Sequence, residues 1–203
     1  MSIFKRMIKT GLKDEELMNE VCGHLRQIGI SATTLESEPK IHAFTNYLGS
    51  IKVEGRNIDL LEVEMKMVGG GDMGAGTSRG VKTYRYNYVV SAKIDGLEDK
   101  LKAATKLIKK GFLRKEVVGL KWEGGDLAQL LNADSDLKTM LDREGLVEHE
   151  IRSDKKSQCI RIRQKKFYLR IMLPSPTREA FEIYDRIAQH IRSIAGTQGV
   201  LET

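Results

Sequence analysis

Residues 58–67 alternate between apolar and polar side chains, which is the period of a β-strand with one buried face. The apolar set is Leu61, Val63, Met65 and Met67, and the polar set is Glu62, Glu64 and Lys66. Residues 84–94 alternate in the same way and carry Tyr84, Tyr86 and Tyr88 on one side. We expect the two segments to pair as a hairpin, with one face on a core and the other face in contact with water.

Three segments show the spacing of three and four residues that is typical of an amphipathic helix. In residues 13–28 the apolar stripe consists of Leu17, Val21, Leu25 and Ile28, and Gly29 follows as a stop. In residues 97–108 it consists of Leu97, Leu101, Ala104 and Ile108, and Gly111 follows. The long segment after Pro176 carries Phe181, Tyr184, Ile187, Ala188, Ile191 and Ile194.

Shorter elements fill the rest of the chain. We expect strands at 32–35, 41–47, 146–152, 158–163 and 167–173. Residues 112–145 form a connector with a strand at 117–122, and Trp122 indicates that this connector is packed. A short helix covers 127–131, and Asp134 or Ser135 caps another helix that stops at Gly145.

This order of elements predicts an α+β protein with antiparallel sheets and flanking helices, built as a single compact domain over residues 1–203. Residues 84–110 and 167–193 both run as strand, turn and helix. The domain is therefore a candidate for two duplicated β-β-α sub-lobes, 13–111 and 146–196, joined by the packed connector 112–145. The alternative is that strand and helix repeat in this order by chance.

Composition narrows the class of protein. The chain has 203 residues, of which 40% are hydrophobic and 31% charged, and this suits a folded globular protein. We expect a cytoplasmic location, because no secretory signal or bilayer-spanning run is evident and Cys22 and Cys159 are interpreted as reduced thiols. The formal charge of +6 favours an anionic partner, such as nucleic acid, an acidic protein or a membrane surface.

The glycine-rich segment 69–80 between the two long strands is a candidate ligand loop. Gly69, Gly71 and Gly74 match the spacing of a dinucleotide-binding fingerprint, and Gly71 and Gly76 match part of a P-loop. Both motifs need a helix after the loop, whereas a tyrosine-rich strand follows here, and Thr77 replaces the P-loop lysine. We therefore interpret the loop as a long, flexible hairpin connection. The alternative is that it orders on a partner, with the candidate residues Gly71, Gly74, Gly76 and Arg79.

Residues 152–170 concentrate positive charge. They contain Arg152, Lys155, Lys156, Arg161, Arg163, Lys165, Lys166 and Arg170, against Asp154 as the single acid. If 158–163 is a strand, Arg161 and Arg163 share a face. Across the next turn Tyr168 and Arg170 join them, so the candidate partner-binding residues are Arg161, Arg163, Lys165, Lys166, Tyr168 and Arg170. The alternative is a solvated face whose arginines pair with Glu62, Glu64, Glu148 or Glu150.

Motifs for catalysis and for metal binding are missing. The sequence has no His-Glu-x-x-His, Gly-x-Ser-x-Gly or Cys-x-x-Cys, and its four histidines are scattered. Cys22 and His24 lack the second pair of ligands that a structural zinc site needs. We expect no metal and no cofactor, and a protein that is not an enzyme.

The sequence thus predicts a non-catalytic binding or scaffold module that meets an anionic or protein partner through the 152–170 face. Three alternatives stay open. The first is single-stranded nucleic-acid binding by the same face. The second is peripheral membrane attachment through the basic amphipathic residues 1–12. The third is a small-molecule enzyme that uses the glycine-rich loop.

Overall fold

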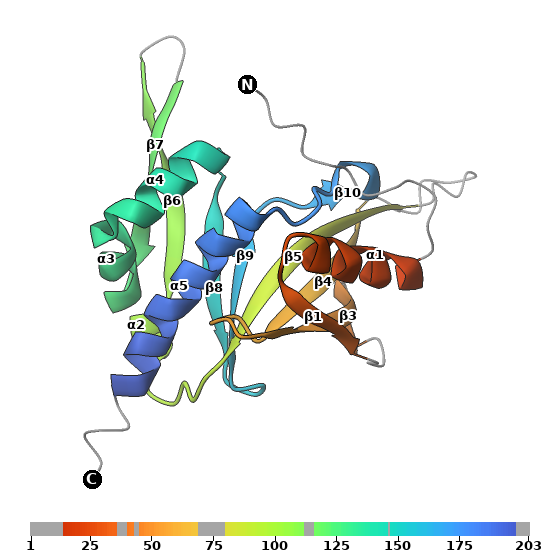
Figure 1. Ribbon diagram of the computed structural model, residues 1–203. Helices are drawn as coiled ribbons and strands as arrows, with labels where there is room; N and C mark the ends of the chain where they lie inside the picture. Colours follow the sequence, from red (N-terminus) through yellow and green to blue (C-terminus); the bar gives the residue numbers. More distant parts are fainter. Residues whose placement is uncertain are drawn as a thin grey trace, which may run out of the picture. The chain divides into compact units, whose positions relative to one another are not determined.

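The computed structural model describes residues 14–35, 40–42, 45–68, 80–111, 116–145 and 147–197, which form helices and antiparallel strands (Figure 1). The predicted α+β class with an antiparallel sheet is confirmed. The chain divides into two compact units. The first unit comprises Met1–Glu54, Leu60–Asn87 and Lys166–Thr177, and the second comprises Gly55–Asp59, Tyr88–Lys165 and Arg178–Thr203. Among the described residues, no helix combines the length and apolar character needed to cross a bilayer.

The first unit packs one helix on a sheet. Its elements are α1 (Asp14–Gln27), β1 (Ser31–Leu35), β2 (Lys40–His42), β3 (Thr45–Glu54), β4 (Leu60–Val68), the first part of β5 (Val81–Ser91), β10 (Tyr168–Leu169) and the 3-10 helix η1 (Arg170–Met172). The strands run in the order β1-β3-β4-β5, while β2 pairs with β3 and β10 pairs with β5. The expected strand 41–47 is therefore divided between β2 and β3, and the expected strand 167–173 is reduced to two paired residues.

The predicted stripe of α1 is confirmed, because Leu17, Val21 and Leu25 are fully buried. Helix α1 packs on β1 and β3. The Met18 side chain lies close to Gly49 of β3, where a Cβ atom would come within 3.2 Å of it. Gly29 has a φ of +84°, the left-handed conformation that ends a helix at low cost for glycine.

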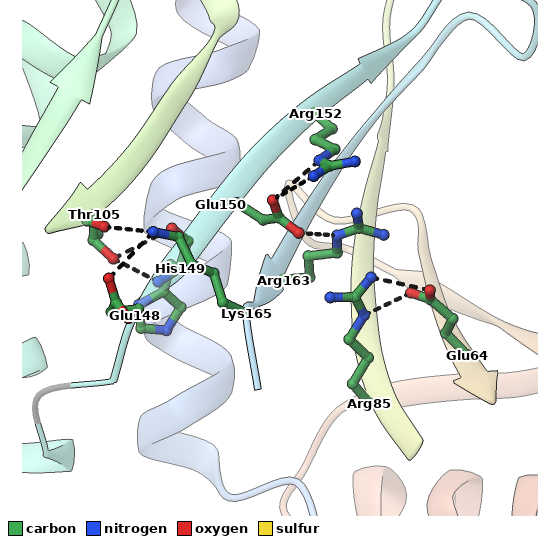
Figure 2. Close-up of polar contacts among 9 residues, drawn as sticks. All are labelled: Glu64, Arg85, Thr105, Glu148, His149, Glu150, Arg152, Arg163 and Lys165. Carbon is green, nitrogen blue, oxygen red and sulfur yellow. Dashed lines mark hydrogen bonds and ion pairs between the residues drawn. The ribbon is translucent and has the colours of Figure 1, made fainter. Parts of the chain in front are cut away.

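The expectation that one face of the β4–β5 hairpin is wet is wrong. Glu62, Glu64, Arg85 and Asn87 are all buried. Glu64 accepts two hydrogen bonds from Arg85, at 2.7 and 3.0 Å (Figure 2). It accepts a third from Asn87 at 3.1 Å. Alternation in sequence identifies the polar face, but it does not distinguish a face in water from one whose charges are paired and buried.

The second unit packs four helices with a second group of strands among its described residues. Its elements are α2 (Glu98–Leu101), β6 (Ala103–Lys110), β7 (Glu116–Gly124), α3 (Asp126–Ala133), α4 (Ser135–Glu144), β8 (His149–Asp154), β9 (Cys159–Gln164) and α5 (Arg178–Thr197). The strands run in the order β9-β8-β6-β7, with β7 at the edge. Helix α5 contacts α3, α4 and β9, and its predicted apolar face, including Phe181 and Ile187, is buried.

The predicted helix over 97–108 is wrong. Leu97 and Leu101 are buried as expected, but α2 ends at Leu101 and Lys102 is already extended. Residues 103–110 form β6, which pairs with β7 along its length and with β8 at its start. Pairing across strands thus overrides the helical spacing of Ala104 and Ile108.

The strand–turn–helix repeat depended on that helix, so the proposed duplication of β-β-α lobes is not confirmed. The boundaries 13–111 and 146–196 also differ from those of the two units. The single compact domain expected for residues 1–203 stays a prediction.

Asp134 caps α4 as predicted and also attaches it to α5. Its carboxylate accepts a hydrogen bond from the Leu137 backbone N–H at 2.9 Å. It also contacts Arg186 Nε and His190 Nε2, each at 2.7 Å. The hydrogen bond from Arg186 is the main reason that the pKa of Asp134 lies far below its usual range, although burial opposes this shift. One buried carboxylate therefore connects two helices.

A series of buried rings lies between α5 and the strands of the second unit. Tyr88 stacks on Tyr184 at a centroid distance of 3.8 Å, and the Tyr184 hydroxyl lies 3.1 Å from His149 Nε2. The His149 ring is in turn 6.1 Å from the ring of Trp122. The Thr105 hydroxyl bonds the backbone of His149, accepting from its N–H and donating to its carbonyl at 3.2 Å. Burial lowers the pKa of His149 to about 4, so the imidazole is neutral at pH 7.

Gly124, at the base of the β6–β7 hairpin, provides a stability test. Its φ is +145°, and a Cβ atom there would lie 2.1 Å from the Lys102 carbonyl oxygen. Gly124→Ala should therefore combine backbone strain of roughly 1–3 kcal/mol with overpacking of similar size. Gly145→Ala is the matched control, because Gly145 has a φ of +97° but no atom within 4 Å of its Cβ position. Urea unfolding should show a larger loss for Gly124→Ala, and equal losses would contradict the close contact.

His149 predicts how stability depends on pH. Because the folded-state pKa of about 4 lies below the ordinary value of 6.5, the unfolded chain binds the proton more tightly. Stability is therefore complete above pH 6.5, falls as the pH is lowered toward 4 and loses about 3 kcal/mol in total from this group. Urea unfolding followed by tryptophan fluorescence should show this loss. His149→Gln should reduce the pH dependence in that window, and an unchanged slope would exclude His149 as its cause.

Candidate functional site

The two arginines of the predicted 152–170 face are paired with carboxylates. Arg161 donates to Asp154 at 2.8 Å, and Arg163 donates to Glu150 at 2.8 Å (Figure 2 shows the second pair). Their side chains are only 15% and 10% exposed. Glu150 also accepts from Arg152, so one carboxylate lies between two guanidinium groups. The alternative predicted from the sequence was that the arginines of this face pair with nearby carboxylates. The structure contains such pairing at Glu150, one of the carboxylates named in that prediction.

The carboxylates of these pairs stay ionised. Burial tends to raise the pKa of Glu150, but Arg163 and Arg152 outweigh it, and the net shift is downward. Burial is likewise outweighed at Asp154, where Arg161 and Ser157 donate to the carboxylate and lower its pKa. Each carboxylate therefore cancels positive charge on this face at neutral pH.

Two lysines of the segment are also engaged. Lys165 donates to the Thr105 carbonyl at 2.9 Å and to Glu148 at 3.2 Å (Figure 2). Lys155 lies 3.3 Å from Glu98, an exposed contact that contributes little to stability. Five cations of this segment therefore lie beside carboxylates of the second unit, namely Arg152, Lys155, Arg161, Arg163 and Lys165.

The remaining predicted residues of this segment belong to the first unit. Lys166 Nζ lies 5.1 Å from the centre of the Tyr168 ring, and burial raises the pKa of Tyr168. Arg170 begins η1, but its side chain lies outside the described residues. Arg161, Arg163 and Lys165 belong to the second unit, so the structure assigns the six predicted residues to two different units.

The glycine-rich loop lies outside the described residues, and with it Gly71, Gly74, Gly76 and Arg79. The same holds for the amphipathic segment 1–12. The proposals for a nucleotide site, for a loop that a partner orders and for a membrane anchor at these positions stay predictions.

Among the described residues, no group of three or more His, Cys, Asp or Glu side chains is arranged to hold a metal ion. A small pocket of about 30 Å³ lies at the foot of the β6–β7 hairpin. It is lined by Leu120, Trp122, Leu131, Asn132, Lys138, Leu141 and Asp142. Pockets that bind small molecules usually enclose roughly 300–1,000 Å³, so this one suits no more than a solvent molecule or two.

The β6–β7 hairpin carries a second group of exposed cations. We define its basic set as Lys106, Lys109, Lys110 and Lys121. Lys106 is 3.6 Å from Glu123, with both side chains more than half exposed, so this pair is weak. Lys109, Lys110 and Lys121 are exposed and have no ion-pair partner within the described ranges.

The strand register fixes the face on which each lysine lies. Lys106 pairs directly with Lys121, and Ile108 pairs with Gly119. Because side chains alternate along β6, Lys106, Ile108 and Lys110 lie on one face, whereas Leu107 and Lys109 lie on the other. A Cβ atom on Gly119 would lie 3.8 Å from Ile108 Cδ1, which agrees with this assignment. A register shift between Ile108 and Lys109 marks a β-bulge in the hairpin.

The base of the hairpin is fixed while its distal part is exposed. Asn132 of α3 donates to the Trp122 carbonyl at 2.8 Å and accepts from its N–H at 2.9 Å. Trp122 is buried, and α3 packs on β7 at this level. Further along, Ile108 is 43% exposed and Val118 is 49% exposed. In Figure 1 the distal ends of β6 and β7 project beyond α3 and α4.

This basic set was not among the residues predicted to bind a partner, although the sequence shows a concentration of positive charge here. Residues 106–121 contain six lysines and arginines against Glu116 as the single acid. The apolar stripe of residues 97–108 predicts a helix, and Lys106, Lys109 and Lys110 would then lie near its C-terminal end, where cations are favoured.

Comparison with family models, with curated proteins and with solved structures finds no match to this chain. A functional assignment therefore depends on the local geometry. Within the described residues, that geometry favours the exposed β6–β7 hairpin as the surface that meets a partner.

Proposed function

We propose that this protein is a non-catalytic binding module for an anionic macromolecule, and that it binds through the basic set of the β6–β7 hairpin. One observation carries the proposal. Lys109, Lys110 and Lys121 are exposed and have no ion-pair partner within the described residues, although Glu116 lies opposite Lys110 in the register, whereas Arg161 and Arg163 are each within 2.8 Å of a carboxylate. An anionic partner would supply the counter-charge that the hairpin lacks.

The spacing of these lysines favours a partner with many charges. A single exposed charge is screened over about 8 Å at physiological ionic strength, so one lysine gives little affinity. Lys106 and Lys121 lie opposite each other, with a separation of about 5 Å between their Cα atoms that is usual for paired strands. Clustered like charges raise the local potential, which favours a polyanion over a single carboxylate or phosphate.

We also propose a cytoplasmic location. Cys22 and Cys159 are both buried and free, which suits a reducing compartment.

The proposal is tested by affinity for a heparin column. The double variant Lys110→Glu and Lys121→Glu should elute at a clearly lower salt concentration than the unmodified protein, because the charge of the hairpin is reversed. The double variant Lys156→Glu and Lys166→Glu is the matched control, since it changes the net charge equally within the 152–170 segment. A larger shift for this control would move the binding surface back to that segment. No retention of the unmodified protein would refute the proposal.

A further inference from the structure

We infer that the anionic partner is an extended acidic peptide segment, which pairs antiparallel with the outer edge of β7 and places a small aliphatic side chain in the pocket beside Leu120. This inference rests on the proposed function and deepens it, because it names the chemical class of the partner. It depends on residues 119–122, which lie in a continuous register with β6.

The outer backbone edge of β7 is open at Leu120. Both backbone groups of Trp122 bond the side chain of Asn132, so they point away from β6. Successive residues of an antiparallel strand direct their backbone groups to alternate sides, so those of Leu120, two residues away, also point outward. Among the described strands, none lies beside β7 on that side. One residue of an antiparallel peptide would bond both groups of Leu120, which is how a peptide extends a sheet.

The small pocket at the foot of the hairpin lies beside this open position. Leu120 and Trp122 line it from β7, and the buried Leu131 and Leu141 line it from α3 and α4. Figure 1 shows α4 beside the strands β6 and β7. A peptide residue directly opposite Leu120 has its side chain on the face of Leu120, toward this pocket. The volume of about 30 Å³ suits a small aliphatic group such as valine, whose methyl groups resemble solvent molecules in size.

The rim of the pocket favours a side chain without charge. Lys138 and Asp142 are both exposed there and have opposite charges. Neither a carboxylate nor an ammonium group is therefore preferred at this position, and the leucines that line the pocket favour an aliphatic group.

The neighbouring positions of such a peptide face lysines. Lys121 follows Leu120 and therefore lies on the opposite face of the sheet, directly paired with Lys106. Both lysines are exposed, and like charges directly opposite each other destabilise a strand pair. The peptide residues before and after the aliphatic one point to this face, where a carboxylate beside Lys121 would relieve the repulsion. The edge thus fits a sequence in which acidic and small aliphatic residues alternate.

The acid closest in the register does not oppose this arrangement. Glu123 shares the face of Lys121 but follows Trp122, whose backbone groups are already bonded to Asn132. A peptide paired at Leu120 therefore leaves the edge before it reaches Glu123. A second copy of this chain fits less well, because antiparallel pairing at Leu120 would make the two copies of Lys121 diagonal neighbours on one face.

The experiment measures the fluorescence anisotropy of a labelled peptide of alternating glutamate and valine with the full chain. We expect saturable binding that weakens as salt is added, because exposed charges are screened. A peptide with glutamine in place of glutamate should bind several-fold more weakly, since it brings no charge to the lysines. A peptide with tryptophan in place of valine should also bind several-fold more weakly, because the pocket is too small for an indole ring.

Two N-methylated peptides separate edge pairing from attraction between charges. If valine lies opposite Leu120, its N–H points toward β7, whereas the N–H of each glutamate points away. Methylation of the valine nitrogens should therefore weaken binding roughly tenfold, because a backbone hydrogen bond is lost. Methylation of the glutamate nitrogens is the matched control. It adds as many methyl groups without removing that bond and should change the affinity much less.

Lys121→Gln tests the charged face on the side of the protein. It should weaken binding of the glutamate–valine peptide several-fold and leave binding of the glutamine–valine peptide unchanged. Lys156→Gln is the control variant, because Lys156 is exposed and lies outside the β6–β7 hairpin, and it should change neither affinity. Thermal unfolding of each variant verifies that the fold is retained.

The other outcomes overturn the inference in distinguishable ways. Equal losses from the two methylations would exclude antiparallel pairing at Leu120. Equal binding of the glutamine peptide would exclude recognition of acids by Lys121, and equal binding of the tryptophan peptide would exclude the pocket. If no peptide binds but a heparin column still retains the protein, the inference is wrong and the proposed function stands. Loss of both results would contradict the proposed function itself.

Discussion

Carboxylates of β8 pair with the arginines of β9, and this pairing decides where the second unit keeps its positive charge. Glu150 lies at the register position opposite Arg163, and Asp154 follows two residues after Arg152, which is the register partner of Arg161. Charges that are partly buried must be compensated, since an unpaired charge away from water costs several kcal/mol. The 152–170 segment contains many cations, but the carboxylates beside Arg161 and Arg163 reduce the positive charge that it can offer to a partner.

The same constraint does not act on the β6–β7 hairpin. Its lysines are in water, where a charge needs no buried counter-ion, and Glu116, the register partner of Lys110, is itself exposed. Stability of the hairpin is supplied instead at its base, by burial of Trp122 and by the hydrogen bonds of Asn132 and Thr105. The residues that stabilise the hairpin therefore lie at its base, whereas its exposed positive charges lie further along the two strands.

Much of the fold could be predicted from periodicity. The stripe of α1, the cap at Asp134, the buried face of α5 and the packing of Trp122 all follow from local rules, and the structure contains them. The failures come from interactions that are distant in sequence. Residues 103–110 are a strand because they pair with residues 116–124, and no local preference reveals this partner. Glu64 is buried because Arg85 reaches it from another strand, so its alternation alone suggested water.

The candidate site was predictable only in part, for the same reason. Counting cations correctly identified residues 152–170 as basic, but compensation by Glu148, Glu150 and Asp154 depends on strand register. In the predicted helix over 97–108, Lys106, Lys109 and Lys110 would have lain near the C-terminal end, where their charge would have served the fold rather than a partner.

The side chain of Asn132 has a consequence for the direction from which the sheet can be approached. Its amide occupies both the donor and the acceptor position that a further strand would take beside Trp122. Strand β7 has no neighbour on its outer side within the described part of the chain, so beyond Trp122 its backbone edge stays open at Leu120 and Val118. Lateral growth of the sheet is thus blocked near the core and permitted toward the tip. A further strand could therefore pair with β7 beyond Trp122, but not at Trp122 itself, where Asn132 already occupies the backbone groups.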